Sequence, residues 1–234
     1  DAANRFRARL QPEDDMPYLD RFKTVILDFD GVILDSAPLK TAAFAETYRC
    51  EEPDKLAEVV AYQQLHGGIG RRQKFEYFER EIFGRPGDEE TVNRLCDRFG
   101  QIIEESMLSC AFIPGAEALL AHLKDIVPMH VVSGMPEDDL KIVIERRGLS
   151  QYFRTVSGSP QSKHVAFLAI MQMENAEASE CLAVGDSLTE FHAARKIGIP
   201  FLAIIAPDVA DLFPADTQKT SDLTDFEHAA RQAR

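Results

Sequence analysis

Apolar residues along the chain form short, densely hydrophobic runs that alternate with longer amphipathic stretches. The first run, residues 22–29, has a β-branched and nearly continuous apolar centre, which is typical of a strand buried on both faces of a parallel sheet. Similar runs predict strands at 129–132, 181–184 and 201–205, with helices between them and a turn at 157–160. Such alternation predicts parallel βαβ units with right-handed crossovers, and therefore an α/β fold.

The stretch 35–111 interrupts this alternation, because its apolar residues recur only with helical spacing. Phe75, Phe78 and Ile82, for example, fall on one face of a helix. No run in this stretch has the length and pattern of a strand. We therefore expect a flavodoxin-like (Rossmannoid) parallel sheet with an inserted α-helical cap domain.

The domain boundaries follow from these patterns. The expected parts are a flexible N-terminal leader at 1–22, an α/β catalytic core formed by 23–34 and 112–234, and a helical cap at 35–111.

Charge and composition exclude several classes of protein. The chain has 26 Lys and Arg against 39 Asp and Glu, a net charge of −13, which argues against nucleic-acid binding. No run approaches the roughly 20 apolar residues of a membrane span, and no signal-peptide pattern opens the chain. The four cysteines lack CxxC spacing, so we expect buried free thiols in a cytoplasmic protein. The oligomeric state stays open.

Polar side chains gather where the predicted strands end. Asp28 and Asp30 follow the first strand, Ser133-Gly134 the second, and Asp186-Ser187 the one at 181–184, with Glu190 close behind. Ligands of open α/β sheets bind beyond the carboxyl ends of the strands. If these strands are neighbours, four acids and a hydroxyl converge on one edge of the sheet.

Clustered carboxylates repel one another unless a cation neutralises them. Mg²⁺ suits oxygen ligands and keeps room in its shell for water and a phosphate oxygen. A carboxylate beside it can attack phosphorus and form an aspartyl phosphate. Ser133 with nearby backbone N–H groups can bind a phosphate oxygen, and Lys163 at a helix start can offset negative charge.

These motifs resemble those of a known superfamily. The segments 28–31, 131–134 and 184–187, together with Lys163, look like the four ordered motifs of the haloacid dehalogenase-like (HAD) hydrolases, over about residues 23–206. A single Asp-x-Asp-Gly motif is weak evidence, but four motifs in order, each at a predicted strand end or helix start, are a strong signal.

The resemblance implies a role for each motif residue. Asp28 is then the nucleophile, and Asp30 is the general acid/base. Ser133, Gly134 and Lys163 hold the phosphoryl group. Magnesium is ligated by Asp28, Asp186 and the Asp30 backbone carbonyl. The family commonly has an Asp where this chain has Glu190, so Glu190, like Ser187, either ligates the metal or supports its ligands.

The position of the insert resembles the helical-cap subgroup that contains phosphoglycolate phosphatase-like and β-phosphoglucomutase-like enzymes. Residues 67–72 look like the cap's substrate loop, with Arg71 and Lys74 facing the substrate. Asp30 is the second acid that the dehalogenase branch lacks. Lys40 stands where the mutase has a His that favours reaction with sugar over water. The resemblance therefore favours plain hydrolysis.

The sequence thus predicts a Mg²⁺-dependent phosphatase that acts on a small phosphorylated metabolite, a sugar phosphate or a phosphoglycolate-like acid, through an aspartyl phosphate. A phosphosugar mutase of the β-phosphoglucomutase type is the alternative with the same chemistry. A phospho-receiver or a non-catalytic binding module is the alternative of another class, because receivers also use clustered acids, a hydroxyl and a Lys.

Overall fold

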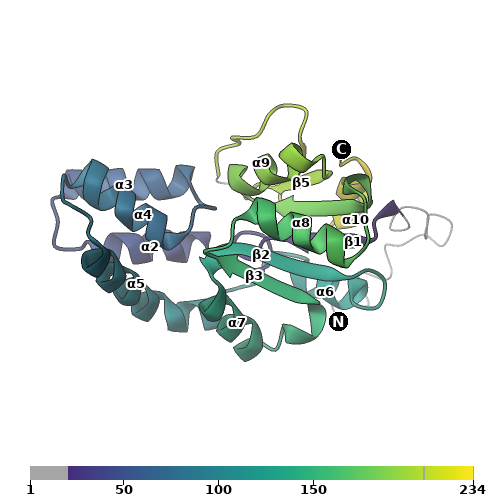
Figure 1. Ribbon diagram of the computed structural model, residues 1–234, viewed down its shortest axis with the longest axis horizontal. Helices are drawn as coiled ribbons and strands as arrows, with labels where there is room; N and C mark the ends of the chain where they lie inside the picture. The colour runs from purple at the N-terminus through teal and green to yellow at the C-terminus, as the bar shows by residue number, and fades with distance from the viewer. Residues whose placement is uncertain (1–20, 208, 234) are drawn as a thin grey trace.

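A computed structural model describes residues 21–207 and 209–233 of the chain (Figure 1). These residues form a six-stranded sheet in the order β3-β2-β1-β4-β5-β6, in which every neighbouring pair is parallel. This is the strand order of doubly wound Rossmann-type sheets, so the predicted parallel α/β fold is confirmed. The strands are β1 (Thr24–Leu27), β2 (Met129–Pro136), β3 (Thr155–Ser159), β4 (Cys181–Gly185), β5 (Phe201–Ile204) and β6 (Gln218–Thr220).

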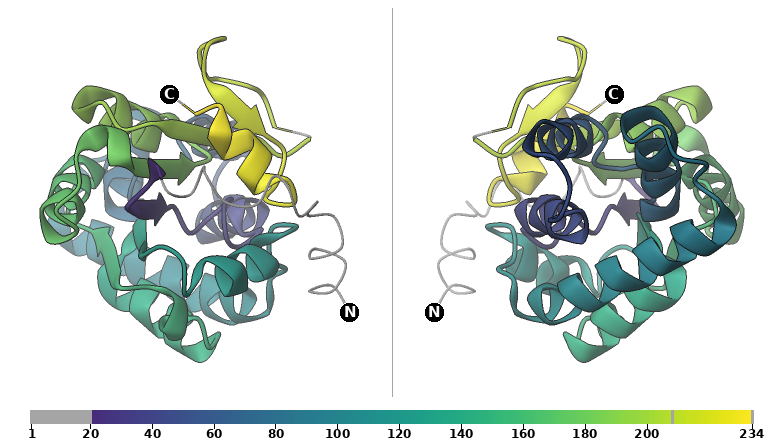
Figure 2. Two further views of the ribbon diagram at one scale, coloured as in Figure 1. Left: turned by 90° about the vertical axis from the view of Figure 1, so that its right-hand side faces the viewer. Right: turned by 90° about the vertical axis from the view of Figure 1, so that its left-hand side faces the viewer.

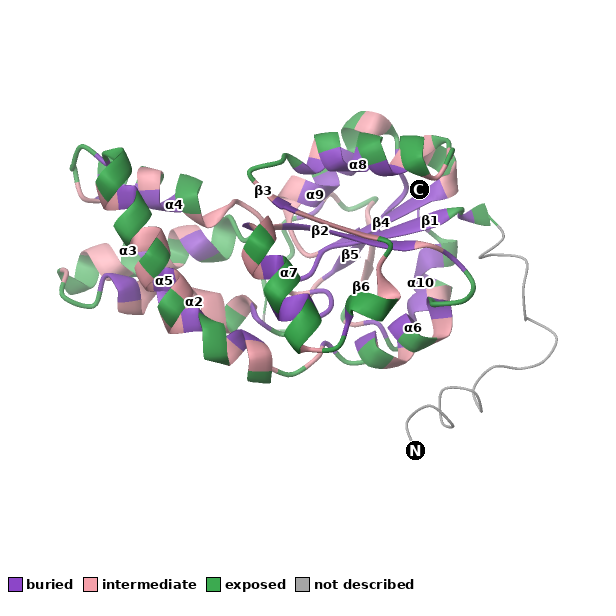
Figure 3. Cartoon of the chain, turned by 60° about the horizontal axis from the view of Figure 1, so that its bottom comes forward, coloured by how far each residue is buried: buried purple, intermediate pink, exposed green. Residues whose placement is uncertain are grey.

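Helices cover both faces of the sheet, because alternate residues of each central strand point to opposite sides. In β1, Val25 and Leu27 join one apolar cluster with the helices on one face, while Ile26 joins a second cluster on the other face. Figure 3 shows the strands buried between helices whose outer surfaces are exposed. One face packs against α6 (Ala116–Leu123), α7 (Glu137–Arg146) and α10 (Phe226–Arg231), and the other against α8 (Lys163–Met173) and α9 (Leu188–Ile197).

The helices between β1 and α6 stand apart from the sheet, at the end of the molecule that faces the viewer in the right panel of Figure 2. We call them the cap helices. Their shared core is aromatic: the Phe44 ring lies 5.2 Å from that of Phe75 and 4.4 Å from that of Phe99. The cap helices are α2 (Ala37–Thr47), α3 (Pro53–Leu65), α4 (Arg71–Tyr77), the π-helix η2 (Phe78–Ile82) and α5 (Glu89–Ser109).

Two chain crossings join the cap helices to the sheet, and they pair with each other. Leu34 and Phe112 form an antiparallel bridge. On either side of it, the Asp35 N–H donates to the Ala111 carbonyl at 2.9 Å and the Ile113 N–H donates to the Ile33 carbonyl at 3.0 Å. The crossings therefore form a short two-stranded ribbon.

Three details differ from the sequence-based expectation. Residues 157–159, predicted as a turn, belong to β3, which is half-buried at one edge of the sheet. β6 forms the other edge and was not predicted. All four cysteines are free, as expected, but only Cys181 is buried: Cys96 and Cys110 are half-buried, and Cys50 is exposed, which contradicts the expected burial.

The remaining expectations concern the membrane and the N-terminus. Among the described residues, every helix is too short or too polar to span a bilayer. Residues 1–20 of the expected leader lie outside the described part of the chain. Phe22, at the end of that range, is buried in the core.

Candidate active site

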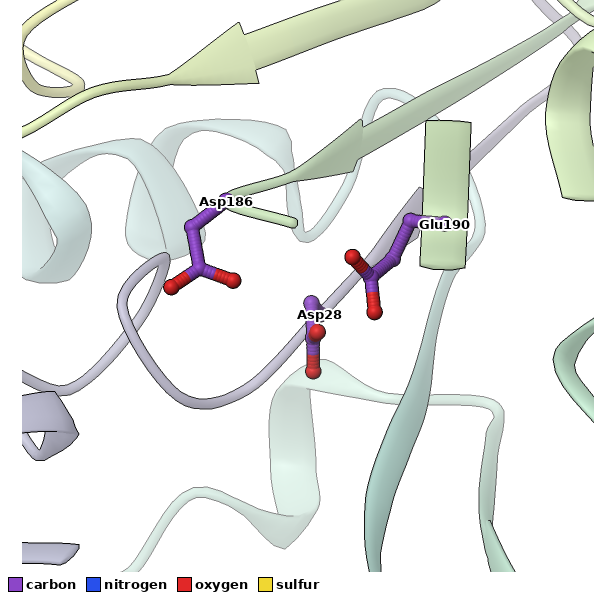
Figure 4. Close-up of side chains that lie close together, drawn as sticks. All are labelled: Asp28, Asp186 and Glu190. Atoms are coloured by element: carbon purple, nitrogen blue, oxygen red, sulfur yellow. The ribbon is translucent and has the colours of Figure 1, made fainter. Parts of the chain in front are cut away.

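The acids of the candidate site meet at the switch point of the sheet, where the chain leaves β1 on one side and β4 on the other. Asp28 follows β1 and Asp186 follows β4. One oxygen from each of Asp28, Asp186 and Glu190 lies within 4.8 Å of the others, as Figure 4 shows for the three side chains. The structure thus gathers carboxylates that are far apart in the sequence.

Gly31 allows this close approach. Its φ of +72° lies in the left-handed region, and a Cβ atom there would come within 2.1 Å of an Asp186 oxygen. Any side chain at position 31 would therefore collide with the carboxylate and strain the backbone. The glycine of the first motif has a packing reason in this structure.

Lys163 is the cation of the cluster. It opens α8, whose N-cap Ser162 accepts a hydrogen bond from the Val165 N–H. Its ammonium donates to Asp28 Oδ2 at 2.7 Å and also forms an ion pair with Glu190. All three side chains are buried, so the pairing compensates charge where water cannot.

Glu190 is held by donors from its own helix. Its Oε2 accepts from the Ser187 backbone N–H at 3.1 Å and from the Ser187 hydroxyl, and its Oε1 accepts from Thr189 Oγ1 at 2.8 Å. Together with the ion pair to Lys163, these bonds engage both carboxylate oxygens. Glu190 therefore orients Lys163 while it caps α9.

Asp30 sits between the core and the cap helices. Its Oδ1 accepts from Ser36 Oγ at 2.6 Å, and its Oδ2 accepts from Ser133 Oγ at 3.2 Å and from the Lys40 ammonium. Burial raises its pKa, but the Lys40 charge and the three hydrogen bonds together outweigh burial. The net result is a pKa below the usual range.

The negative charge of Asp186 is poorly compensated by its surroundings. Burial, and then the negative charge of Asp28, raise its pKa to about 7, although Lys163 acts in the opposite direction. A divalent cation at this point would remove that repulsion. The donor set, all carboxylate oxygens, fits a hard cation such as Mg²⁺.

The Ser133-Gly134 pair belongs to β2 and lines the same cavity as Asp28. Besides its bond to Asp30, Ser133 Oγ accepts from the Met135 N–H at 3.1 Å. A Cβ on Gly134 would come within 2.7 Å of the Gly68 carbonyl oxygen. The glycine-rich loop 67–70 of the cap therefore rests directly on this motif.

The two cap residues predicted to face the substrate both line a cavity above Asp28 and Asp186. Arg71 is engaged there, because its guanidinium donates to the Cys96 carbonyl at 3.2 Å and pairs with Asp139. Lys74 is buried and bonds Gln63 and the Gly67 carbonyl.

Asp139, Gln63 and Thr189 are residues of the site that the motifs did not identify. Asp139 belongs to the acidic first turn of α7, an ordinary feature of helix starts, and Thr189 follows a motif residue. Nothing in the sequence links Asp139 to Arg71, since only the fold brings them together.

Comparison with known proteins agrees with this geometry. Residues 22–198 match the haloacid dehalogenase-like hydrolase family. The sequence is similar to a phosphoglycolate phosphatase of Pseudomonas fluorescens, 26% identical over 78% of this chain and 69% of the relative. A phosphoglycolate phosphatase of Synechococcus elongatus is 25% identical over 78% of this chain and 83% of the relative.

Solved structures share the fold. CbbY from Rhodobacter sphaeroides, in complex with phosphate, has a TM-score of 0.71 at 15% identity, over 88% of this chain and 96% of that one. β-Phosphoglucomutase from Clostridium difficile has a TM-score of 0.70 at 16% identity, over 90% and 96%. With its sheet, its acidic cluster and its phosphatase relatives, the chain belongs to the haloacid dehalogenase-like hydrolase family and is an enzyme of the phosphatase type.

Proposed function

We propose that the protein hydrolyses a small phosphate monoester, a sugar phosphate or a phosphoglycolate-like acid, with Mg²⁺ and through an aspartyl phosphate on Asp28. The observation that carries the proposal is the position of Asp28: it is buried at the switch point, bonded to Lys163 at 2.7 Å, and clustered with Asp186. The proposed transfer needs a nucleophile, a cation and a metal ligand around one point, and these three side chains would fill those roles.

Magnesium would be held by the carboxylates of Asp28 and Asp186 and by the Asp30 backbone carbonyl. When bound, it would neutralise the clustered acids and the charge on the phosphoryl oxygens. Glu190 would not bind the metal directly, because its oxygens are already engaged by Ser187, Thr189 and Lys163. It would instead hold Lys163 in place beside the metal ligands.

The covalent chemistry belongs to the two aspartates of the first motif. A carboxylate oxygen of Asp28 would attack phosphorus as the ester P–O bond breaks, and Asp30 would give a proton to the leaving oxygen. Because the Lys40 contact lowers the Asp30 pKa, this proton transfer requires that contact to be released when the substrate binds. Asp30 then takes a proton from a water molecule whose oxygen attacks the phosphorus. The bond to Asp28 breaks, and inorganic phosphate and the free enzyme are formed.

Positioning and charge stabilisation would supply most of the rate. Ser133, the backbone at Gly134 and Lys163 surround the place where the phosphoryl oxygens would lie. The loop 67–70 rests against both Gly134 and the start of α9, so the cap helices would exclude bulk water from the reacting atoms.

The alternatives are less well supported. A likeness to β-phosphoglucomutase extends to the fold alone, and Lys40, the residue at the position where the mutase has a His, is tied to Asp30. A phospho-receiver or non-catalytic module does not fit the family match to hydrolases. Plain hydrolysis is therefore the function that we propose.

Replacing the nucleophile tests this proposal. We expect Asp28→Asn to lower the Mg²⁺-dependent hydrolysis of p-nitrophenyl phosphate and 2-phosphoglycolate by about 10⁴-fold or more, because no carboxylate remains to accept the phosphoryl group. Phosphate release would be measured with and without Mg²⁺, and mass spectrometry of acid-quenched enzyme would seek a phosphoryl group on Asp28.

Asp35→Asn is the matched control, since Asp35 is an exposed acid in the same segment. Its activity should stay close to that of the wild type. Substantial activity in Asp28→Asn, or a wild-type enzyme indifferent to Mg²⁺, would contradict the proposed mechanism.

A further inference from the structure

A small cavity of about 60 Å³ lies between the acidic cluster and the cap helices. Asp28, Asp30 and Asp186 line it from the core side. Three cations line it from the cap side: Lys40, Arg71 and Lys74. Whether each cation already has a negative partner decides which of them is available to a ligand.

Two of the three cations are neutralised within the protein. Lys40 forms an ion pair and a hydrogen bond with Asp30. Arg71 pairs with Asp139 of α7, donates to the Cys96 carbonyl, and packs its guanidinium 5.6 Å from the centre of the Phe99 ring. Neither requires a ligand to balance its charge.

Lys74 differs from both. It is 2% exposed, and its ammonium donates only to neutral oxygens, Gln63 Oε1 at 2.6 Å and the Gly67 carbonyl at 2.9 Å. The ring of Phe44 lies 5.4 Å from the nitrogen. Within the described part of the chain, no carboxylate forms an ion pair with it.

Burying an ammonium without a counter-ion is unfavourable. The pKa of Lys74 falls to about 7, first because of burial and then because of repulsion by Lys40, with partial compensation from the more distant Asp30 and Asp186. An ammonium has three N–H donors, and the two neutral acceptors use two of them. Charge and one hydrogen-bond donor therefore remain for a group in the cavity.

We propose that Lys74 binds an anionic group, a carboxylate, on the leaving-group side of the substrate, and so selects short acid phosphates over neutral phosphate esters. This inference rests on the proposed phosphatase function and narrows its substrate class. The lining of the cavity supports it, because Lys74 lines the same small space as Asp28 and Asp186. Lys74 takes this role rather than Arg71, because Arg71 already forms an ion pair with Asp139.

Two substrates of the same length separate charge recognition from phosphate recognition. 2-Phosphoglycolate carries a carboxylate where 2-hydroxyethyl phosphate carries a neutral CH₂OH group. We expect the wild-type enzyme to prefer the acid, in kcat/KM, by about 10- to 100-fold, because a hydrogen bond between charged groups in a buried site is replaced by one to a neutral group.

Lys74→Met keeps most of the side-chain volume and removes the charge. We expect it to lose the preference, because kcat/KM for 2-phosphoglycolate should fall about 10-fold or more beyond any fall for 2-hydroxyethyl phosphate. Lys74→Arg should recover part of the preference. Arg80→Met, which removes an exposed cation of the same cap, is the matched control and should keep it.

The possible failures are distinguishable. Equal losses on both substrates in Lys74→Met would mean that Lys74 supports the cap and does not select, which overturns this inference and leaves the phosphatase proposal standing. If circular dichroism shows that Lys74→Met does not fold, the wild type decides: no preference for the acid overturns the inference. Activity retained in Asp28→Asn would instead remove the function on which the inference rests.

Discussion

The core half and the cap half of the site carry opposite charge. The core contributes carboxylates that outnumber their cation, with Asp28, Asp186 and Glu190 around one Lys163. The cap contributes cations, of which Lys40 crosses over to pair with Asp30. The core half alone has excess negative charge, and the cap half alone has excess positive charge. Contact between the two halves therefore also balances the charges of the site. If the proposed hydrolysis requires the cap helices to close, closure would also balance these charges, and three substitutions probe the contact between the halves.

Separating the halves should have the largest effect among the changes that leave every candidate catalytic residue in place. A Cβ on Gly68 would come within 2.0 Å of Thr189 Oγ1 and 2.2 Å of Ser187 Oγ, two groups that are fixed in a hydrogen-bond network. We expect Gly68→Val to lower kcat/KM about 10- to 100-fold, because the loop no longer seats on α9. Steady-state kinetics would measure it.

The neighbouring Gly67 supplies the control for this change. A Cβ there meets nothing within 4 Å, so Gly67→Val adds the same side chain without the collision. Both variants should unfold at similar temperatures. Equal kinetic losses in the two would show that the loop's contact with α9 does not matter.

Removing a core carboxylate should change stability as well as activity. The folded pKa of Asp186, about 7, lies above the ordinary value of 3.8, so the metal-free folded protein binds this proton more tightly than the unfolded chain does. The stabilisation is complete below about pH 4 and is lost as the pH rises to about 7. The free energy of unfolding of the metal-free wild type should thus fall by on the order of 2–4 kcal/mol over this pH range because of Asp186 alone.

We expect the stability of Asp186→Asn not to fall in this way as the pH rises, so that this variant is more stable than the wild type at pH 8 without metal. With Mg²⁺ it should be inactive. Urea unfolding of EDTA-treated protein at pH 5 and pH 8 measures the difference. Asp125→Asn, at an exposed carboxyl, is the control. Parallel pH dependence in Asp186→Asn and wild type would contradict the expectation.

Loosening the contact between the halves should have the smallest effect. The Arg71–Asp139 pair joins α4 of the cap to α7 of the core, and the Asp139 side chain is 43% exposed. Such pairs contribute about 0.2–1 kcal/mol, so Asp139→Asn should raise KM for 2-phosphoglycolate by up to about 5-fold, and high salt should reduce the difference.

Asp138→Asn provides the comparison, because Asp138 is an exposed acid in the same turn of α7. It should leave KM unchanged. A shift as large as that of Asp139→Asn would assign the effect to the general charge of the helix start and not to the pair with Arg71.

The sequence was most informative where burial is complete. β1, β4 and β5 are buried along their length, so their apolar runs are continuous and their ends locate the motif residues. The strands that sequence reasoning missed, β3 and β6, are the two edges of the sheet. Edge strands are half-solvated and need no apolar run, so Thr155–Ser159 and Gln218–Thr220 resemble loops in composition.

The residues of the candidate site also fall into a predictable group and an unpredictable one. The motif residues of the core follow from local order along the chain, and the structure brings Asp28, Lys163 and Asp186 together. The interaction partners of the cap residues cannot be predicted from the order of residues along the chain. Two basic residues of α4 differ in this respect: Arg71 pairs with Asp139, whereas Lys74 has no carboxylate partner among the described residues. That difference depends on which carboxylates the fold places nearby.

The ribbon formed by the two crossings, Leu34 beside Phe112, has a consequence for turnover. Two independent tethers would let the cap helices twist and drift, and each return would be a search over many orientations. The crossings are instead hydrogen-bonded to each other at Asp35 and Ile113, so the two connections form one ribbon. If the cap helices move during the proposed turnover, such a ribbon would restrict them to one direction of rotation and return Gly68 and Lys74 to the same position over Asp28.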